Sequence, residues 1–193
     1  MPTYQTHGIT PETFKHLILD AGAVYKNYGE PDEKLIGATS GGNTFTVERE
    51  IREIEMDGAR GKVKGARRII TENASLSINL LEMSVENFKM ALTAADVSDV
   101  VDPDDGVTKI ADKIQPRGKI LDSDYIKNVA LVAAVSGTDQ PVVIILYNVL
   151  SDGEFSLQMQ DKDEGKPEIT LSAHYDPAQL DVVPYQIRYP VVA

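Results

Sequence analysis

The sequence contains no cysteine among its 193 residues. A disulfide framework, a thiolate metal site and a cysteine nucleophile are therefore excluded. Basic residues are also scarce, because 19 Lys and Arg stand against 30 Asp and Glu, which gives a formal net charge of -11. Since an acidic surface repels phosphate groups, this balance argues against a general nucleic-acid-binding protein.

Long apolar runs and targeting segments are missing too. The longest apolar stretch, 128–150, is divided by Gly137, Asp139 and Pro141, and neither part reaches the roughly 18 residues that a membrane-spanning helix needs. The first residues lack the basic start and apolar centre of a secretion signal, so we expect a cytoplasmic product without a membrane partner. The length favours a single domain, 1–193, that buries a core of its own.

Motifs that carry chemistry are equally hard to find. The segment 58–63 has the wrong glycine spacing for a phosphate loop, and no hydroxyl residue follows Lys62. None of the three histidines stands in a zinc-binding pair, and the segment 102–106 breaks the order of a calcium-binding EF-hand loop. We therefore expect no catalytic residue, no cofactor, no metal and no small-molecule substrate.

The segment 44–57 alternates between apolar and polar residues, which predicts a strand with one face in water. Glu48 and Glu50 lie on its polar parity. The apolar parity then shifts to Ile54 and Met56, so we expect a bulge near residues 52–53.

The dipeptide Asp57-Gly58 predicts a tight two-residue hairpin turn, because both residues accept positive φ. Such a turn would place Glu55 opposite Arg60, Glu53 opposite Lys62 and Glu48 opposite Arg67 as attractive cross-strand pairs. A longer loop over 58–61 would instead oppose Arg52 with Arg67. The charge pattern favours the tight turn.

A second alternating segment, 74–81, is followed by a change of period. Ser84 can cap a short helix whose apolar residues recur at spacings of three and four. A proline after Thr10 predicts a weaker helix there, and residues 1–16 form either that helix or an extended arm.

The rest of the chain reads as strands separated by turns. We expect strands at 125–135, 142–150, 154–160, 168–174 and 185–189, and an acidic, proline-containing surface loop at 98–106. Closely spaced strands with one clear helix predict a mainly β fold, a β-sandwich or barrel with a flanking α-helix and a long β-hairpin. The core residues that this pattern predicts are Phe45, Val47, Ile51, Leu76, Ile78, Leu80, Phe88 and Leu92.

Several stretches of the chain, taken in order, resemble the major tail tube proteins of tailed phages. They are HLILDAGAVYKNYG, LIGATSGGNTFTVEREIREIEMDGARGKVKGARRI, ENASLSINLLEMSVENFKMAL, DYIKNVALVAAVSG, PVVIILYNVL and ITLSAHYDPAQLDVVPYQIRYP. The most distinctive is GATSGGNTFTVEREIREIEMDG running into GKVKG. The first few residues and the segment 98–106 are not covered.

This resemblance implies a non-enzymatic structural protein of the virion. Six copies would form a ring, and rings would stack into a hollow tail tube that conducts DNA during ejection. The implied partners are further copies of the chain, the tape-measure protein, the tail terminator and the distal tail proteins, with DNA only in transit. The implied location is the virion tail, after assembly in the host cytoplasm.

Within this frame, some residues become candidates for the tube's surfaces. Acids that line the lumen would keep DNA from adhering, and we expect Glu48 and Glu50 there, although the outer wall or the space between rings is an equal alternative. Candidates for contacts between subunits or rings are Gly41, Gly42, Asn43, Asp57, Gly58, Arg60, Lys62, Lys64 and Arg67.

Two other kinds of protein remain open at this stage. One is the inner tube of a contractile injection device or of a type VI secretion system, which resembles the tail tube in fold. The other is a monomeric β-sandwich module that binds a sugar or a protein. The scattered positions of the tyrosines argue against the second, because a binding module would gather aromatic side chains in its loops.

Overall fold

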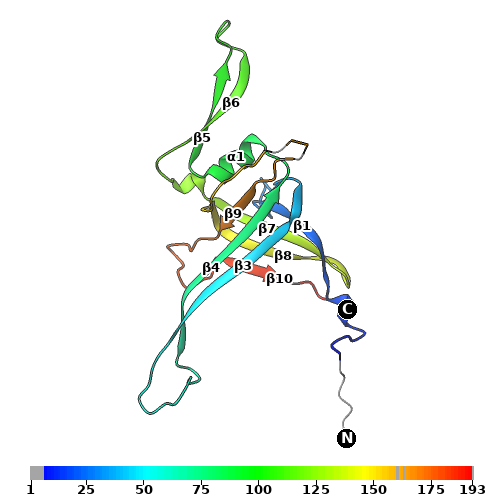
Figure 1. Cartoon of the computed structure of the whole chain (residues 1–193), viewed down its shortest axis with the longest axis vertical. Coiled ribbons are helices and arrows are strands. Elements are labelled where there is room, and N and C mark those ends of the chain that lie inside the picture. Colours follow the sequence, from blue (N-terminus) through cyan, green and yellow to red (C-terminus); the bar gives the residue numbers. More distant parts are fainter. Residues whose placement is uncertain (1–6, 160, 163, 193) are drawn as a thin grey trace.

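The protein is built from one large antiparallel sheet, a separate two-stranded hairpin and one α-helix (Figure 1). The computed structural model describes residues 7–159, 161–162 and 164–192. Its strands are β1 (Ile18–Lys26), β2 (Lys34–Leu35), β3 (Thr39–Glu53), β4 (Arg67–Leu80), β5 (Ala95–Val101), β6 (Lys109–Pro116), β7 (Ile126–Val135), β8 (Thr138–Ser151), β9 (Glu168–Ser172) and β10 (Tyr185–Arg188). The fold is therefore mainly β, as the sequence predicts.

The eight-stranded sheet folds over on itself because β8 has partners in two layers. The strand order is β2-β1-β7-β8-β9-β4-β3, and β10 also pairs with β8. β8 pairs with β10 over 143–146 and with β9 only at Leu150 and Ser151. Asn148, between these two segments, has a φ of 49°, a conformation that Asn tolerates better than most residues. The strand thus changes layer at this point.

The core fills the space between the two layers. In β4, Leu76, Ile78 and Leu80 are fully buried, and they contact Leu146 of β8 and Leu171 of β9 in one cluster. The expected core residues Phe45, Val47, Phe88 and Leu92 are only half-buried. Phe45 nevertheless packs against the core cluster.

The helix α1 (Val85–Leu92) starts where the sequence predicts. Ser84 is its N-cap, and its hydroxyl accepts a hydrogen bond from the backbone N–H of Asn87 at 3.2 Å. The buried face centres on Asn87 and Ala91 rather than on the predicted apolar stripe. The reason is that the Asn87 amide donates to the backbone oxygens of Ile36 and Glu82, which draws this face against the sheet.

The β3–β4 hairpin differs from its predicted form. Glu53 is opposite Arg67 and Arg52 is opposite Arg68, so residues 54–66 form a long loop instead of a tight Asp57-Gly58 turn. The register shifts by one residue beside Glu50 and Ile51, where Ile70 is the extra residue of β4. The bulge therefore lies earlier than expected, and the register predicted from three attractive cross-strand pairs is wrong.

Three smaller expectations also change. Residues 98–101 of the predicted acidic loop belong to β5, because they continue its pairing with β6 from Ser98, opposite Lys113, to Val101, opposite Lys109. Of the predicted strand 154–160, the described residues 154–159 contribute only an isolated bridge between Ser156 and Glu168. Residues 13–15 form a short 3-10 helix, while the first six residues of the expected N-terminal arm lie outside the described part of the chain.

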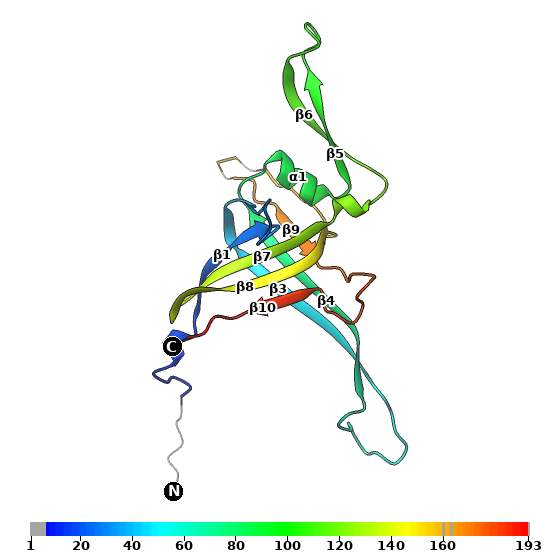
Figure 2. The same cartoon turned by 180° about the vertical axis from the view of Figure 1, so that it is seen from behind.

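Two hairpins extend from the body in opposite directions. The far end of β3–β4 points away at one end of the long axis, and β5–β6 stands at the other end (Figures 1 and 2). The body of the sheet and α1 lie between them. Among the described residues, no helix is both long and apolar enough to cross a membrane.

Candidate functional site

The arm, defined as residues 50–71, is the part of the β3–β4 hairpin that lies beyond the pair Arg49 and Glu72. A three-residue cluster fixes its base. Arg49 Nη2 lies 2.8 Å from Glu72 Oε1, and Tyr185 Oη of β10 donates to the same carboxylate oxygen at 2.6 Å. Arg49 also donates to Tyr185 Oη at 2.8 Å. β3, β4 and β10 are thereby held together where the arm leaves the body.

The charges within this cluster reinforce one another. The hydrogen bond from Arg49, followed by that from Tyr185, holds the pKa of the Glu72 carboxyl below its usual range. The Glu72 carboxylate in turn raises the pKa of the Tyr185 phenol. The Glu72 side chain is only 8% exposed, so its charge is stabilised by two donors rather than by water.

Large apolar side chains on the arm face solvent. The set comprises Ile51 (44% exposed), Ile54 (39%), Met56 (51%), Ile69 (55%) and Ile70 (54%). Ile51 was expected in the core; instead it lies opposite Ile69 on a hairpin that has left the body, where the second layer no longer covers it. An apolar surface on a projecting hairpin is typical of a contact with another molecule.

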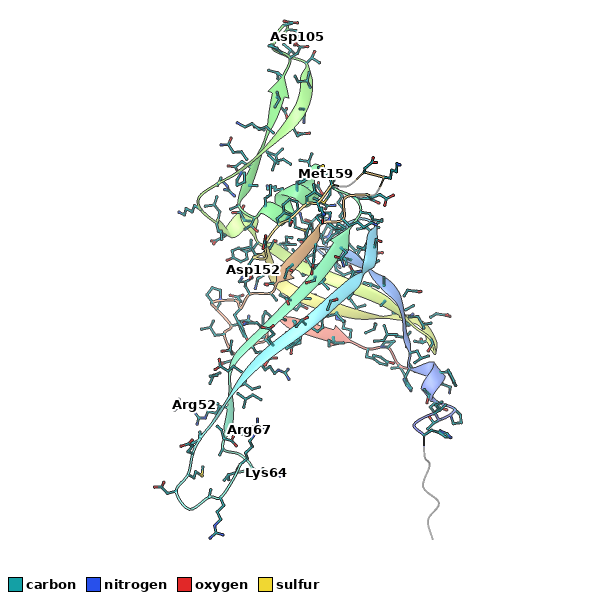
Figure 3. The ribbon with its side chains drawn as sticks, in the orientation of Figure 1. Arg52, Lys64, Arg67, Asp105, Asp152 and Met159 are labelled. Carbon is teal, nitrogen blue, oxygen red and sulfur yellow. The ribbon has the colours of Figure 1, made fainter. Side chains whose placement is uncertain are left out.

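Basic side chains gather on the returning half of the arm. Residues 58–68 contain five Lys and Arg and no Asp or Glu. These five are Arg60, Lys62, Lys64, Arg67 and Arg68. A sixth, Arg52, lies on the β3 half of the arm, and all six side chains are exposed. In the described part of the chain, none of the six forms an ion pair within 4.0 Å. Figure 3 shows three of them, Arg52, Lys64 and Arg67, on the arm.

The residues predicted to make contacts between subunits or rings lie in two separate places. Asp57, Gly58 and the cations lie in the arm, whereas 41–43 lie at the other end of β3 beside β1. There Gly41 and Gly42 have φ values of 92° and 88°, which suits glycine. Asn79 donates to the Gly42 oxygen, and Asn43 donates to the Ala21 oxygen, each at 3.0 Å. These residues shape a β-bulge that joins β3 to β1.

The polar face is the outer side of β3, β4 and β9. The pairing of Phe45 with Leu76 puts the odd residues of β3 on the core side and leaves Glu48 and Glu50 on the outside. The face consists of Thr44, Thr46, Glu48, Glu50, Thr71, Asn73, Ser75, Ser77, Asn79, Glu168, Thr170 and Ser172. It carries acids, hydroxyls and amides, and the first cations on the same parity are Arg52 and its partner Arg68, where β3 and β4 enter the arm.

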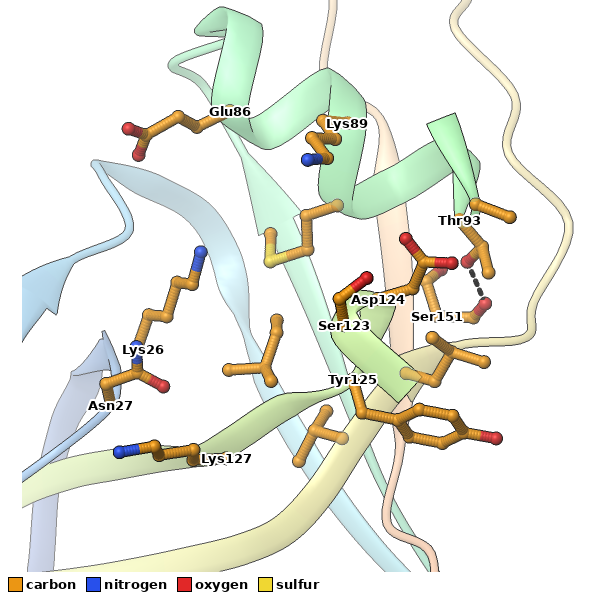
Figure 4. A pocket seen from close by; sticks show the side chains of 15 residues that line it. Lys26, Asn27, Glu86, Lys89, Thr93, Ser123, Asp124, Tyr125, Lys127 and Ser151 are labelled. Atoms are coloured by element: carbon orange, nitrogen blue, oxygen red, sulfur yellow. Dashed lines mark hydrogen bonds between the residues drawn. The ribbon is translucent and has the colours of Figure 1, made fainter. Parts of the chain in front are cut away.

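A pocket of about 370 Å³ lies between α1, β1 and the start of β7 (Figure 4). Its walls carry Lys26, Lys89 and Lys127 together with Glu86 and Asp124. Glu86 is paired with Lys34 at 2.7 Å, and Lys127 is paired with Glu30 at 3.3 Å. This pocket could not be predicted from local sequence patterns, because its walls come from segments about 120 residues apart. Among the described residues, no cluster of three or more His, Asp or Glu side chains could hold a metal ion.

Comparisons with known structures find likenesses of fold, of which two are described. One is to a chain of the virion of a native gene transfer agent particle, with a TM-score of 0.42, 11% identity, and coverage of 87% of this chain and 96% of that one. The other is to a chain of the tail of an empty particle of that kind, which has C6 symmetry, with a TM-score of 0.39, 11% identity, and coverage of 81% and 92%. At these values, the likenesses do not establish a shared function. No protein-family model and no curated protein matches the sequence.

Proposed function

We propose that this chain is the structural subunit of a phage-type tail tube, in which six copies form a ring and rings stack around a hollow lumen. The observation that carries the proposal is the arm: large aliphatic side chains, 39–55% exposed, project on a hairpin beyond the reach of the chain's own core. Burial of such a surface needs a neighbouring subunit. The ordered resemblance of the sequence to tail tube proteins supports the same assignment.

Unpaired strand edges offer a way for subunits to join within a ring. Among the described residues, β3 pairs only with β4, and β10 pairs only with β8. Each strand therefore presents one row of backbone N–H and C=O groups without a strand partner, and such edges readily pair with another chain. Edge-to-edge pairing around six subunits would produce one continuous inner barrel.

The polar face is our candidate for the wall of the lumen. A surface of hydroxyls, amides and the acids Glu48, Glu50 and Glu168 hydrates well and repels phosphate. DNA in transit would slide past it, because the nearest cations on this parity, Arg52 and Arg68, lie only where the strands enter the arm. With the polar face inward, the half-buried residues Phe45 and Val47 remain on the side of the protomer's own core.

The other surfaces then serve assembly. We assign the segment 41–43 to contacts within the ring, and the residues Asp57, Gly58, Arg60, Lys62, Lys64 and Arg67 of the arm to contacts between rings. The protomer acts as a single, non-enzymatic domain, 1–193. Its other partners are the tape-measure protein inside the tube and the terminator and distal proteins at the tube's ends, in a virion tail assembled in the host cytoplasm.

Negative-stain electron microscopy of the concentrated protein, alone and mixed with its tape-measure protein, tests this function. We expect hollow six-fold rings or tubes. Particles with the mass of one chain in both samples would contradict the tube and favour the monomeric binding module. A sheath bound around the tube would assign it instead to a contractile device.

A further inference from the structure

The two hairpins at opposite ends of the protomer carry opposite charge. Residues 58–68 of the arm contain five basic and no acidic residues, whereas residues 102–106 at the tip of β5–β6 contain three acidic and no basic ones. Figure 3 shows Lys64 and Arg67 at one end of the molecule and Asp105 at the other. We propose that the basic arm of one copy docks on the β5–β6 hairpin of the next copy, head to tail.

In the β3–β4 ladder the arm places one acid opposite a cation, Glu53 across from Arg67. Its cations make no ion pair within the described part of the chain. Arg52 and Arg68 even lie directly opposite each other in the β3–β4 ladder. Like charges in such positions repel, so the free protomer is destabilised there and an acidic neighbour relieves the repulsion.

The lysine next to the tip of the β5–β6 hairpin, Lys109, pairs with acids of the strands and leaves the acids of the tip unpaired. Lys109 lies 2.9 Å from Asp99 and 2.7 Å from Asp112. Asp102 and Asp105, by contrast, accept backbone hydrogen bonds within the turn, from Asp104 and from Val107 and Thr108. Within the described residues, the carboxylates at 102, 104 and 105 have no ion pair, so the tip keeps its charge for a partner.

The hairpin also has the architecture of a segment that another molecule covers. β5 and β6 pair only with each other among the described strands. A lone two-stranded ribbon is at best marginally stable in water. Val97 (40% exposed), Val107 (82%) and Ile110 (57%) lie along it. Ile54 and Met56 near the far end of the arm are likewise apolar and exposed, so the two surfaces can pack against each other. Docking would bury both sets and cover the ribbon.

A contact that joins one end of a protomer to the opposite end of the next protomer is heterologous. When such contacts do not close into a ring, they continue as an open filament. The inference deepens the proposed function by naming the two surfaces that meet between successive rings.

A phosphate backbone is the other ligand that a basic hairpin could bind. The same arm carries the acids Glu53, Glu55 and Asp57 ahead of its basic segment, and aromatic residues for base stacking are absent from 50–71, so the second copy is favoured.

Charge reversal gives a matched set of variants. The arm variant is Arg60→Glu, Lys62→Glu and Lys64→Glu; the tip variant is Asp102→Lys, Asp104→Lys and Asp105→Lys. The arm variant should keep the wild-type circular dichroism and melting temperature, because Arg60, Lys62 and Lys64 are exposed. The tip variant also removes the turn hydrogen bonds that Asp102 and Asp105 accept, so its circular dichroism and melting temperature are measured before its association is compared with that of the wild type. A control variant, Lys119→Glu, changes an exposed charge outside both hairpins.

Sedimentation and electron microscopy at low ionic strength provide the readout. Either variant alone should lose longitudinal association by about tenfold or more relative to wild type, since like charges would then meet. An equal mixture of the two, and the chain that carries both sets of reversals, should recover association. The doubly reversed chain should not join wild-type filaments, and the control should behave as wild type.

The possible results of this experiment distinguish a failure of the proposed docking from a failure of the proposed tube. Rings that stack equally well in the single variants would overturn the docking of arm on tip and leave the tube intact. Charge-dependent head-to-tail chains without six-fold rings would support the docking and contradict the tube. A wild-type protein that does not associate at high concentration and low salt, or an arm that binds duplex DNA and not the tip, would overturn the docking.

Discussion

The phenol of Tyr185 in β10 donates a hydrogen bond to the Glu72 carboxylate in β4 at 2.6 Å. The two residues are 113 positions apart, and their contact crosses from one layer of the sandwich to the other. Arg49 of β3 binds both of them. The direction in which the arm leaves the body therefore depends on one small polar cluster.

Removing the phenol should weaken that cluster. We expect Tyr185→Phe to lower the free energy of unfolding by about 1.5–3 kcal/mol, the range for a hydrogen bond to a charged group. Chemical denaturation measures the change. Tyr125→Phe is the control, because its ring is 37% exposed and packs edge-on against His174. Equal stability of the two variants would contradict the role of the cluster.

The cluster also predicts a pH dependence. Because the pKa of Glu72 is lowered in the folded protein, its contribution is complete above the unfolded-state pKa of about 4.3. That contribution is lost as the pH falls through the lower, folded-state pKa. Glu72→Gln should therefore reduce the stability difference between neutral and acidic pH. A difference as large as that of the wild type would show that Glu72 ionises with the same pKa in both states.

Two isoleucines of β4 should respond differently to truncation. Ile78 is fully buried, so Ile78→Ala should cost about 2–5 kcal/mol of unfolding free energy. Ile69 on the arm is 55% exposed, and Ile69→Ala should change the stability of the free chain by about 0.5 kcal/mol or less. In the proposed tube, however, Ile69→Ala should weaken assembly. The reverse order in thermal melts would contradict the boundary drawn between body and arm.

Gly137 in the β7–β8 turn should be sensitive to a single methyl group. A Cβ there would lie 2.4 Å from the Lys15 backbone oxygen and 2.6 Å from Val192 Cγ1. Gly137→Ala should therefore loosen the docking of residues 13–17 and speed their hydrogen exchange. Gly118→Ala is a matched control, because nothing lies within 4 Å of its Cβ position. Unchanged exchange in Gly137→Ala would show that the turn has room to adjust.

Local patterns sufficed to predict much of the fold. The alternation of Leu76, Ile78 and Leu80 marks the core face of β4, and Ser84 marks the start of α1. The predicted β3–β4 register was wrong for a physical reason. Cross-strand ion pairs contribute little to the stability of a sheet, so three of them could not outweigh the backbone geometry of a long loop. The strand within 98–101 was hidden because Ser98, Asp99, Val100 and Val101 show no alternation of apolar and polar residues and run directly into an aspartate-rich turn.

The surfaces were harder to predict than the core. The sequence identified the acids Glu48 and Glu50 and the basic segment of the arm, but not the cluster of Arg49, Glu72 and Tyr185. Its members come from three strands, and their contact depends on how the two layers stack. The opposite positions of the arm and the acidic hairpin depend in the same way on the complete topology.

A cryo-electron microscopy reconstruction of the assembled protein tests the central claim most directly. The account predicts a hollow tube of six-fold rings, with the polar face of β3, β4 and β9 lining the lumen and the side chains of Glu48 and Glu50 pointing into it. An assembly without a lumen, or a tube with Glu48 and Glu50 on its outer wall, would contradict it.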